Sequence, residues 1–575
     1  MKLIDGLATQ EDTELRLAKV FLMEKDMSQT NATKIWDSHR REKVSRLQAI
    51  KRDGKIVQTE NICEILETLI KSGDRVVVEG NNQKQADFLA RSLAKVDPEK
   101  IHDLHMIIPS ISIPEHLDIF EKGIARKLDF SYSGTQSLRI SQMIEDDVLE
   151  IGAIHTYVEL YSRLYVDLIP NVVMVAGYKA DRKGNLYTGP STEDTPALVE
   201  AAAFHDGIVI AQVNEIVDED DLPRVDIPGS WVDVVVVSDK PFFIEPLFTR
   251  DPRQIKPQHI LMAMMAIKGI YAKHMVQTLN HGIGFNTAAI ELLLPTYGES
   301  LGLKGKICKH WCLNPHPTLI PAIESGWVES VHSFGGELGM EDYMAARPDV
   351  FFTGSDGSMR SNRAFCQLAG QYAADMFIGS TLQVDPVGNS STVTRGRLSG
   401  FGGAPNMGHD PHGRRHASKA WLDMIREPDP VARGHKLVVQ MVETFQAKGK
   451  PTFVDQLEAV DVAKEARMPL APVMIYADDV THVLTEEGIA YVYMAESLEE
   501  RKAMISAVAG VTEIGLRADP KEVLRLRRQG KVVYPEDLGI YRAQATRSLL
   551  AAKSVAELVE WSGNLYNPPV KFRSW

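Results

Sequence analysis

Short apolar runs alternate with longer segments of mixed polarity along most of this chain. Nearly continuous apolar runs are typical of strands buried on both faces of a sheet. Strands separated by helical segments predict parallel pairing through right-handed crossovers. The expected strands of the first half are residues 75–79, 105–108, 172–176, 207–211 and 232–237. Those of the second half are residues 351–352, 376–379, 471–475 and 491–494.

The chain of 575 residues is too long for one hydrophobic core and predicts several domains. We expect an α/β protein with two tandem, related domains built on mainly parallel sheets. A site is expected at their interface, near the carboxyl ends of the strands. The expected parts are a helical N-terminal extension (1–54), two α/β domains (55–256 and 257–520) and a charged, helical C-terminal extension (521–575).

Composition narrows the class of protein. The net charge of −13 disfavours a nucleic-acid partner, which needs a concentrated basic surface. No apolar run approaches the roughly 18–20 residues of a membrane span, and the N-terminal region lacks the apolar core of a signal peptide. The four cysteines argue against a disulfide framework. We therefore expect a cytoplasmic protein.

Glycine-rich loops are the candidate ligand-binding segments. The segment 399–408, SGFGGAPNMG, holds four glycines, which allow backbone N–H groups to approach a ligand closely. The segments 379–385 and 280–284 are further loops of this kind. Such N–H groups suit thioester or phosphate oxygens. A tight turn that packs a strand on a helix is the structural alternative for each loop.

Several motifs, in order along both halves, resemble the coenzyme A transferase family. Residues 179–186 read KADRKGNL and are similar to its KADRxGNL segment. The likeness continues with IPGSWVD at 227–233, NHGIG at 280–284, GFGGA at 400–404 and VTHVLTE at 480–486. Within that superfamily, WDSHRREK at 36–43 and the run from 400 to 415 resemble the α subunit of malonate decarboxylase.

The resemblance implies an acyl-carrier-protein transferase that exchanges acetate for malonate on the thiol of a carrier protein. It implies no tightly bound cofactor, because the carrier supplies the CoA-like prosthetic group, a phosphoribosyl-dephospho-CoA. The implied partners are the acyl carrier protein, malonyl-carrier decarboxylase subunits, malonate and acetate, with neither nucleic acid nor membrane. A transferase acting on free CoA thioesters of another dicarboxylate and a non-catalytic scaffold stay open as alternatives. A nicotinamide-dependent dehydrogenase is disfavoured because no GxGxxG follows the first strand.

The expected mechanism is direct attack of the incoming carboxylate on the thioester. Many members of the superfamily carry a catalytic glutamate in a SENG turn, but residues 307–317 here read ICKHWCLNPHP. Malonate is itself a nucleophile, so the protein must hold the reactants and stabilise an oxyanion. The candidate catalytic residues are Gly402, Gly403 and Ala404, with Gln136 in a turn placed like the family's Gln-Gly-Thr.

The remaining candidate residues would hold the two substrates. Those expected to bind the thioester or the CoA-like arm are Asn280, Gly282, Gly284, Gly400 and Asn406. Those expected to line the substrate site are Asn314, His316, Arg360 and Arg397, since an arginine suits the second carboxylate of malonate. The sequence does not choose among the six arginines near the motifs, which also include Arg363, Arg395, Arg414 and Arg415.

No metal site is expected from the sequence. Cys308, His310, Cys312 and His316 lie close together in the chain, but no second pair with zinc-ligand spacing accompanies them.

Overall fold

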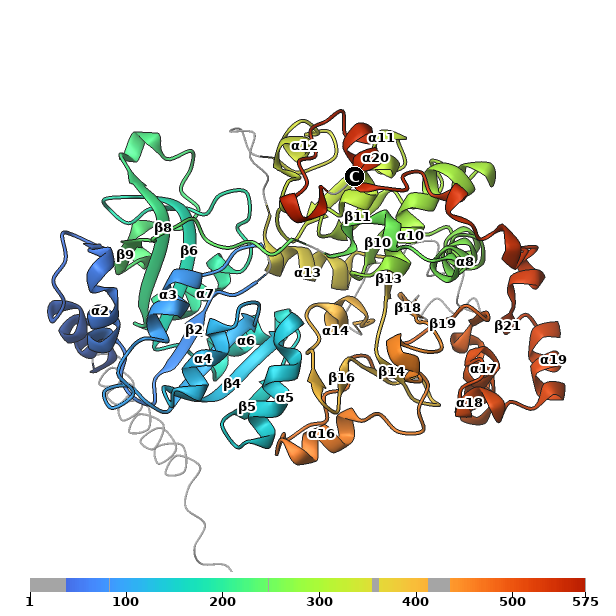
Figure 1. Cartoon of the computed structure of the whole chain (residues 1–575), viewed down its shortest axis with the longest axis horizontal. Helices are drawn as coiled ribbons and strands as arrows, with labels where there is room; N and C mark the ends of the chain where they lie inside the picture. Colours follow the sequence, from blue (N-terminus) through green and yellow to red (C-terminus); the bar gives the residue numbers. More distant parts are fainter. Residues whose placement is uncertain (1–37, 82, 247, 354–360, 412–434, 574–575) are drawn as a thin grey trace, which may run out of the picture.

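Two α/β units lie side by side in this computed structural model, which describes residues 38–81, 83–246, 248–353, 361–411 and 435–573 (Figure 1). Of the expected N-terminal extension, residues 38–48 are helical, and residues 1–37 lie outside the described part. Among the described residues, no helix is both long and apolar enough to cross a membrane.

The first unit is built on a nine-stranded sheet in which every pairing is parallel except that of β6 with β7. Along the sheet the strands are β1 (Ile56–Val57), β9 (Val234–Val237), β8 (Ile208–Val217), β6 (Val172–Asp181), β2 (Arg75–Val78), β3 (Leu104–Ser110), β4 (Ala125–Tyr132) and β5 (Glu150–Ile154), with β7 (Leu186–Tyr187) beside β6.

Helices cover both faces of this first sheet. On β2, Val76 and Val78 point into one hydrophobic core and Val77 into the other, as the two-residue period of a strand requires. The helices of the first core are α2 (Ile62–Leu69), α3 (Asp87–Leu93), α4 (Glu115–Glu121) and α5 (Ser137–Glu145); those of the second are α6 (Tyr157–Val166) and α7 (Thr195–Ala203). Burial on both faces explains why the strands are apolar at successive positions.

The second unit is built on an eight-stranded sheet. Its order is β12 (Ser330–Ser333), β11 (His310–Leu313), β10 (Thr278–His281), β13 (Met376–Gly379), β18 (Leu437–Met441), β19 (His482–Leu484), β20 (Ile489–Ala490) and β21 (Val532–Val533). The first six strands are parallel, and β20 is antiparallel to both of its neighbours, β19 and β21. Helices α8 (Pro257–Ala266), α10 (Phe285–Leu293), α17 (Leu498–Val508) and α20 (Val555–Trp561) contribute to one large core. The predicted class, tandem α/β units with mainly parallel sheets, is confirmed.

Three local predictions for the second half were wrong. Residues 471–475 form only an isolated bridge, between Ser390 and Ile475. Residues 492–494 form a 3₁₀ turn, and β20 ends just before it. Phe351 makes only a bridge to Val331. Most of these apolar residues are buried, although Phe352 is exposed, and an apolar run alone does not distinguish a short strand from a buried turn.

The sheet of the second unit extends beyond residue 520, the expected start of the C-terminal extension. Strand β21 pairs with β20, and α19 (Pro520–Arg528) leads into it. Further on, the Ala551 N–H donates to Leu292 O at 3.0 Å, and the Asn567 N–H donates to Gly339 O at 2.8 Å. The end of the chain therefore packs on the second unit.

Each sheet has one point at which the strand order reverses direction. In the first sheet the chain proceeds from β2 outward to β5 and then crosses to β6, on the other side of β2. In the second sheet it proceeds from β10 to β12 and then crosses to β13. Ligands of open α/β sheets bind outside the carboxyl ends of strands at such points.

Candidate functional site

The glycine loop of the second unit is attached to the carboxyl end of β4 in the first. The N–H groups of Phe401 and Gly402 both donate to Ser131 O, at 2.7 and 2.9 Å. Gly400 forms a bridge with Tyr132 and has a φ of 71°. A Cβ at Gly400 would clash with Ser131 O, so both the conformation and the close approach require glycine.

Of the three predicted oxyanion donors, two already donate within the protein. The Gly402 N–H is bonded to Ser131, and the Ala404 N–H donates to Phe401 O at 3.3 Å. Among the described residues, the Gly403 N–H has no hydrogen-bond acceptor. Gly403 is half-buried, and it directly precedes the short helix α14 (Ala404–Met407). The arrangement leaves Gly403 as the donor available to a ligand.

Helix α13 (Arg363–Tyr372) supports this loop from the second unit, where the two units meet (Figure 1). A Cβ on Gly403 would clash with the amide of Gln367. The same amide hydrogen-bonds with Asn406, whose side chain also bonds with Thr156 of the first unit. Asn406 was predicted to contact the CoA-like arm; its internal partners are those of a residue that positions the loop.

A buried charged cluster joins the two units beside the loop. Arg363, at the start of α13, donates to Glu193 Oε2 from Nε and Nη2 at 2.9 and 2.7 Å. Its Nε also lies 3.0 Å from Asp194 Oδ1. The guanidinium carbon lies 4.5 Å from the ring centre of Tyr157, and this ring is the nearest neighbour of a Cβ at Gly402. The ring of Tyr157 therefore lies between the glycine loop and the ion cluster, and these three form one wall of the candidate site.

Glu193 has an unusual environment. Two carboxyl groups share the one guanidinium of Arg363, so the group carries an excess negative charge unless one carboxyl holds a proton. Burial raises the pKa of Glu193 to about 7, although Arg363 lowers it. Its Oε1 has no hydrogen-bond partner among the described residues, and Gly335 lies so close that a Cβ there would overlap it. The φ of Glu193 is 51°, a left-handed conformation.

A second buried ion pair lies near the strand-order reversal of the first sheet. Lys84 Nζ and Glu79 Oε1 are 3.1 Å apart, and both side chains are fully buried. Glu79 also accepts from Thr195 Oγ1 at 2.6 Å, and Lys84 donates to Thr192 O at 3.0 Å. Sequence reasoning found neither this pair nor Glu193. The two adjacent acids, Glu193 and Asp194, just before an apolar helix were the available signal.

The predicted loop Asn280–Gly284 lies at the strand-order reversal of the second sheet. The Gly282 N–H donates to Ile378 O of β13 at 2.8 Å, and a Cβ on Gly282 would lie 3.0 Å from Gly379 Cα. Gly284 directly precedes α10. The glycines thus permit a close crossing at the place where this fold binds ligands.

Asn314 and His316 follow β11, where relatives in the superfamily carry the SENG turn. Both are buried. His316 Nδ1 lies 3.1 Å from Glu291 Oε1, to which His281 Nδ1 also bonds at 3.0 Å. Burial alone would raise the pKa of Glu291. The neighbouring His316 and His281 have the larger opposite effect, and together they lower this pKa to about 2. Asn314 Oδ1 and His316 Nε2 have no partner among the described residues. Each therefore keeps one polar atom unused.

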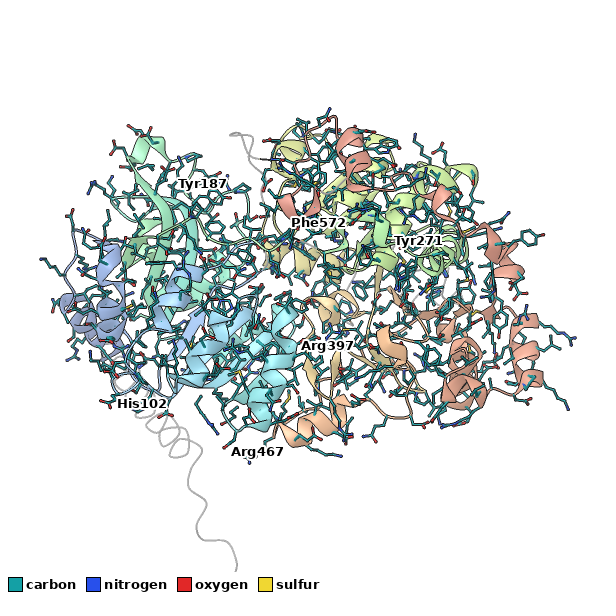
Figure 2. All side chains as sticks on the ribbon, in the orientation of Figure 1. His102, Tyr187, Tyr271, Arg397, Arg467 and Phe572 are labelled. Carbon is teal, nitrogen blue, oxygen red and sulfur yellow. The ribbon has the colours of Figure 1, made fainter. Side chains whose placement is uncertain are left out.

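Gln136 and Arg397 lie on opposite sides of the boundary between the units. Gln136 ends the 3₁₀ turn η2 (Gly134–Gln136), and its side chain is half-buried. Arg397, labelled near the middle of Figure 2, is exposed on β17 (Arg397–Leu398), which contacts α5. It makes no ion pair among the described residues, and its charge acts on Tyr132. Arg360 lies outside the described residues.

The structure connects most of the predicted residues through α13. Gln367 supports Gly403, while Cys366 of the same helix contacts Cys312 on β11. The carbonyl of Cys312 accepts a hydrogen bond from the side chain of Asn280. One helix thus links the glycine loop, the loop after β10 and the first unit.

A separate surface hollow is formed by the N-terminal helix 38–48 and the amino ends of the first-unit strands. Its lining includes Lys43, Arg75, Asn171 and Gly207. Because sites of open α/β sheets lie at the carboxyl ends of strands, this hollow is not the candidate site.

The fold and the position of the site define a class. A similar fold is found in the α subunit of citrate lyase from Streptococcus mutans. That structure matches with a TM-score of 0.57 at 17% identity, covering 82% of this chain and 88% of that one. The likeness concerns the fold alone, which is that of coenzyme A transferase-like proteins.

Comparisons with more similar sequences identify the family of this chain. The family described as malonate decarboxylase, alpha subunit, transporter matches residues 35–575, and the chain belongs to it. An acetyl-S-ACP:malonate ACP transferase of Malonomonas rubra is 58% identical over 94% of this chain and 99% of its own length. The resemblance inferred from the motifs is confirmed.

Two solved structures match almost the whole chain. One is a Pseudomonas malonate decarboxylase hetero-tetramer in complex with malonate, with a TM-score of 0.92 and 73% identity over 94% of this chain and 99% of that one. The other is a malonate decarboxylase alpha subunit from Acinetobacter baumannii, with a TM-score of 0.91 and 71% identity over 93% and 100%.

Proposed function

We propose that this chain is an acyl-carrier-protein transferase that converts acetyl-carrier protein and malonate into malonyl-carrier protein and acetate. This is the activity that names the Malonomonas relative, with which the chain shares 58% of its residues. The observation that carries the proposal within the molecule is the Gly403 N–H, which has no acceptor in the described part of the chain and belongs to a loop fixed between the two units. The exchange would be the first step of malonate decarboxylation that uses no biotin.

The proposed chemistry needs no covalent nucleophile from the protein. A malonate carboxylate oxygen attacks the acetyl thioester carbonyl, the C–S bond breaks, and the carrier thiolate leaves with the electron pair. The thiolate then attacks the malonyl carbonyl of the mixed anhydride, and acetate departs with the electrons of the broken C–O bond. Each attack places negative charge on a carbonyl oxygen. The Gly403 N–H is placed to stabilise it, and loss of such a donor costs about 2.7–4 kcal/mol of barrier.

The residues after β11 fit direct attack. At the place of the SENG glutamate the chain has Asn314 and His316, which cannot form a glutamyl thioester. Glu193 is a carboxyl group beside the loop, but it is 1% exposed and held by Arg363. We assign Glu193 and Arg363 to the positioning of the loop wall, through the ring of Tyr157.

Arg397 is our candidate for the second carboxylate of malonate. It is exposed at the boundary between the units and has no ion-pair partner among the described residues. Gln136 follows the end of β4 on the other side of this boundary. A charge-assisted contact with a carboxylate contributes about 1.5–3 kcal/mol, which is enough to distinguish malonate from acetate.

The second substrate is the carrier protein with its prosthetic arm, which we take to be a phosphoribosyl-dephospho-CoA group. The loop from Asn280 to Gly284 fits such an arm because Gly282 lies at the strand-order reversal, where a side chain would obstruct the crossing. The unused polar atoms of Asn314 and His316 supply further contacts at the same edge of the sheet.

Decarboxylase subunits are the proposed partners, since the Pseudomonas relative forms a hetero-tetramer. All four cysteines are free, as is typical of the cytoplasm.

The exchange can be measured by mass spectrometry. Purified chain is incubated with acetyl-carrier protein and isotopically labelled malonate, and a parallel tube contains acetyl-CoA instead. We expect labelled malonyl-carrier and released acetate in the first tube. Exchange with free CoA alone would assign the chain to ordinary coenzyme A transfer. A folded chain that is silent in both tubes would contradict the transferase proposal.

A further inference from the structure

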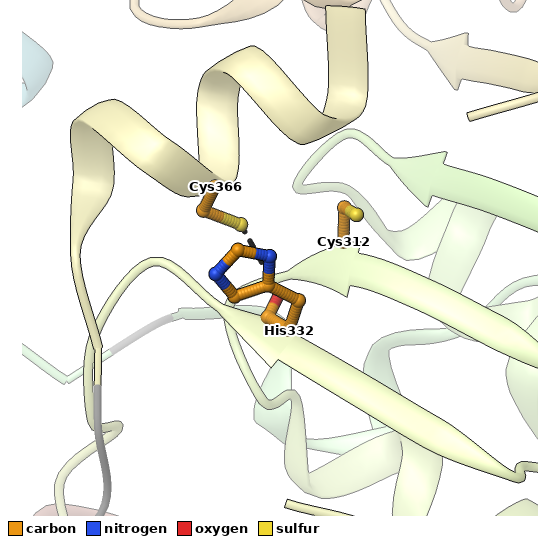
Figure 3. A group of neighbouring side chains, drawn as sticks. All are labelled: Cys312, His332 and Cys366. Carbon is orange, nitrogen blue, oxygen red and sulfur yellow. Dashed lines mark hydrogen bonds between the residues drawn. The ribbon is translucent and has the colours of Figure 1, made fainter. Parts of the chain in front are cut away.

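Two cysteines and a histidine from three separate elements converge beneath helix α13. Cys312 is on β11, His332 on β12 and Cys366 on α13 (Figure 3). One ligand atom from each residue, the two sulfurs and a ring nitrogen, lies within 4.8 Å of the other two. Both cysteines are buried and the histidine is half-buried.

The fold itself brings these side chains together. In the parallel pairing of β11 with β12, Cys312 lies directly opposite His332, so both side chains point to the same face of the sheet. Helix α13 packs against β11 and β12 on that face. The Cys366 thiol donates to the backbone oxygen of His332 at 3.1 Å, as the dashed line in Figure 3 shows. No spacing rule could reveal the cluster, because its members come from separate segments.

The donor set is selective in its chemistry. Thiolate and imidazole together suit zinc, whereas calcium and magnesium require oxygen ligands. The cluster supplies two sulfurs, from Cys312 and Cys366, and one ring nitrogen, from His332. By contrast, Cys308 and His310, which lie close to Cys312 in the sequence, are not members of the cluster.

We propose that Cys312, His332 and Cys366 bind a zinc ion. With bonds of about 2.3 Å to sulfur and about 2.0–2.1 Å to nitrogen, tetrahedral zinc separates two sulfurs and one nitrogen by roughly 3.5–3.8 Å. The observed arrangement thus needs to contract by no more than about 1.5 Å. Zinc binds thiolates, so binding releases the thiol protons to solvent, and the fourth position is left to a water molecule.

The proposed zinc ion would attach α13 to the second sheet. The same helix begins with Arg363, which binds Glu193 and Asp194, and continues with Gln367, which supports the Gly403 loop. The metal would therefore help to hold the wall of the site, and its presence does not depend on the transferase activity proposed above.

Metal content is the direct test. The full-length chain is purified without a metal-affinity tag under reducing conditions, supplied with one equivalent of zinc, desalted, and analysed by inductively coupled plasma mass spectrometry. We expect close to one zinc per chain, and at least a tenfold lower content in Cys366→Ser and Cys312→Ser. Cys63→Ser, in the first unit and outside the cluster, is the matched control and should keep its zinc. Wild-type protein without zinc, or equal zinc in all four proteins, would overturn the proposal.

A second measurement uses the wild-type chain first, so its main result does not depend on how well the variants fold. Wild-type chain loaded with cobalt(II) in place of zinc should show the intense absorption of tetrahedral thiolate–cobalt coordination, and one equivalent of zinc should abolish it. His332→Asn keeps both thiols but removes the imidazole, so it should weaken metal retention. A cobalt spectrum of octahedral type, or one that lacks the thiolate absorption, would refute the site.

Discussion

Replacement of Glu193 by glutamine tests whether a buried carboxyl group holds a proton at the wall of the site. Glu193 and Asp194 share Arg363, and Glu193 is 1% exposed. Because burial raises the pKa of Glu193 from 4.5 to about 7, the folded protein binds more protons than the unfolded chain between these two values. This contribution to stability is therefore complete below pH 4.5 and is lost as the pH rises through 7.

The size of the effect follows from the two pKa values. A difference of about 2.5 units corresponds to roughly 3 kcal/mol of unfolding free energy, since each unit is worth about 1.36 kcal/mol. Wild-type protein should therefore lose roughly 3 kcal/mol between pH 4.5 and pH 8 through this group alone. Glutamine resembles the protonated carboxyl in shape and carries no charge. The Glu193→Gln variant should lack this part of the pH dependence and gain stability relative to wild type as the pH rises.

Urea unfolding, followed by far-ultraviolet circular dichroism from pH 5 to 8.5, gives the required comparison. The quantity to examine is the difference in unfolding free energy between Glu193→Gln and wild type at each pH. Glu499→Gln removes an exposed charge on α17 and serves as the control, with a difference that does not change with pH. A Glu193→Gln difference that is equally constant would refute the protonated state. A variant that becomes relatively less stable toward high pH would show that Glu193 is ionised and bound tightly to Arg363.

Three further predictions concern the reaction. Gly403→Ala keeps the N–H and suits the φ of −90°, but its Cβ should displace Gln367 and so shift the loop, which should lower the rate of malonate exchange by about 100-fold or more; an unchanged rate would show that the contact with Gln367 does not position this donor. Arg397→Ala should raise the KM for malonate about 10- to 100-fold, whereas Arg395→Ala, which removes an exposed ion pair with Asp461, should not; equal KM values in the two variants would place the carboxylate elsewhere. Hydroxylamine treatment during turnover should trap no acyl-enzyme, and a hydroxamate at Glu193 in the mass spectrum would replace direct attack by a covalent mechanism.

The strongly apolar strands could be predicted from the chain alone, and the shorter elements could not. Residues 75–78, 172–176 and 376–379 lie within strands because their side chains are buried on both faces of a sheet. The prediction of a strand at 471–475 was wrong although this segment is also apolar. An apolar run predicts that a segment is buried. Whether the buried segment becomes a strand depends on a neighbouring strand with which it can pair, and the run does not encode that neighbour.

Part of the candidate site could likewise be predicted from the sequence, and part of it depends on the tertiary structure. The sequence by itself determined the family, the order of its motifs and the positions where the backbone needs glycine, such as Gly400 with its φ of 71°. The tertiary structure decided which N–H group remains free, because Gly402 is bonded to Ser131 of the other unit. It also paired Glu193 with Arg363 and brought Cys312, His332 and Cys366 together. Motifs are local properties of the chain, whereas free donors, shared charges and ligand clusters depend on contacts between segments that only the packing of the two units brings together.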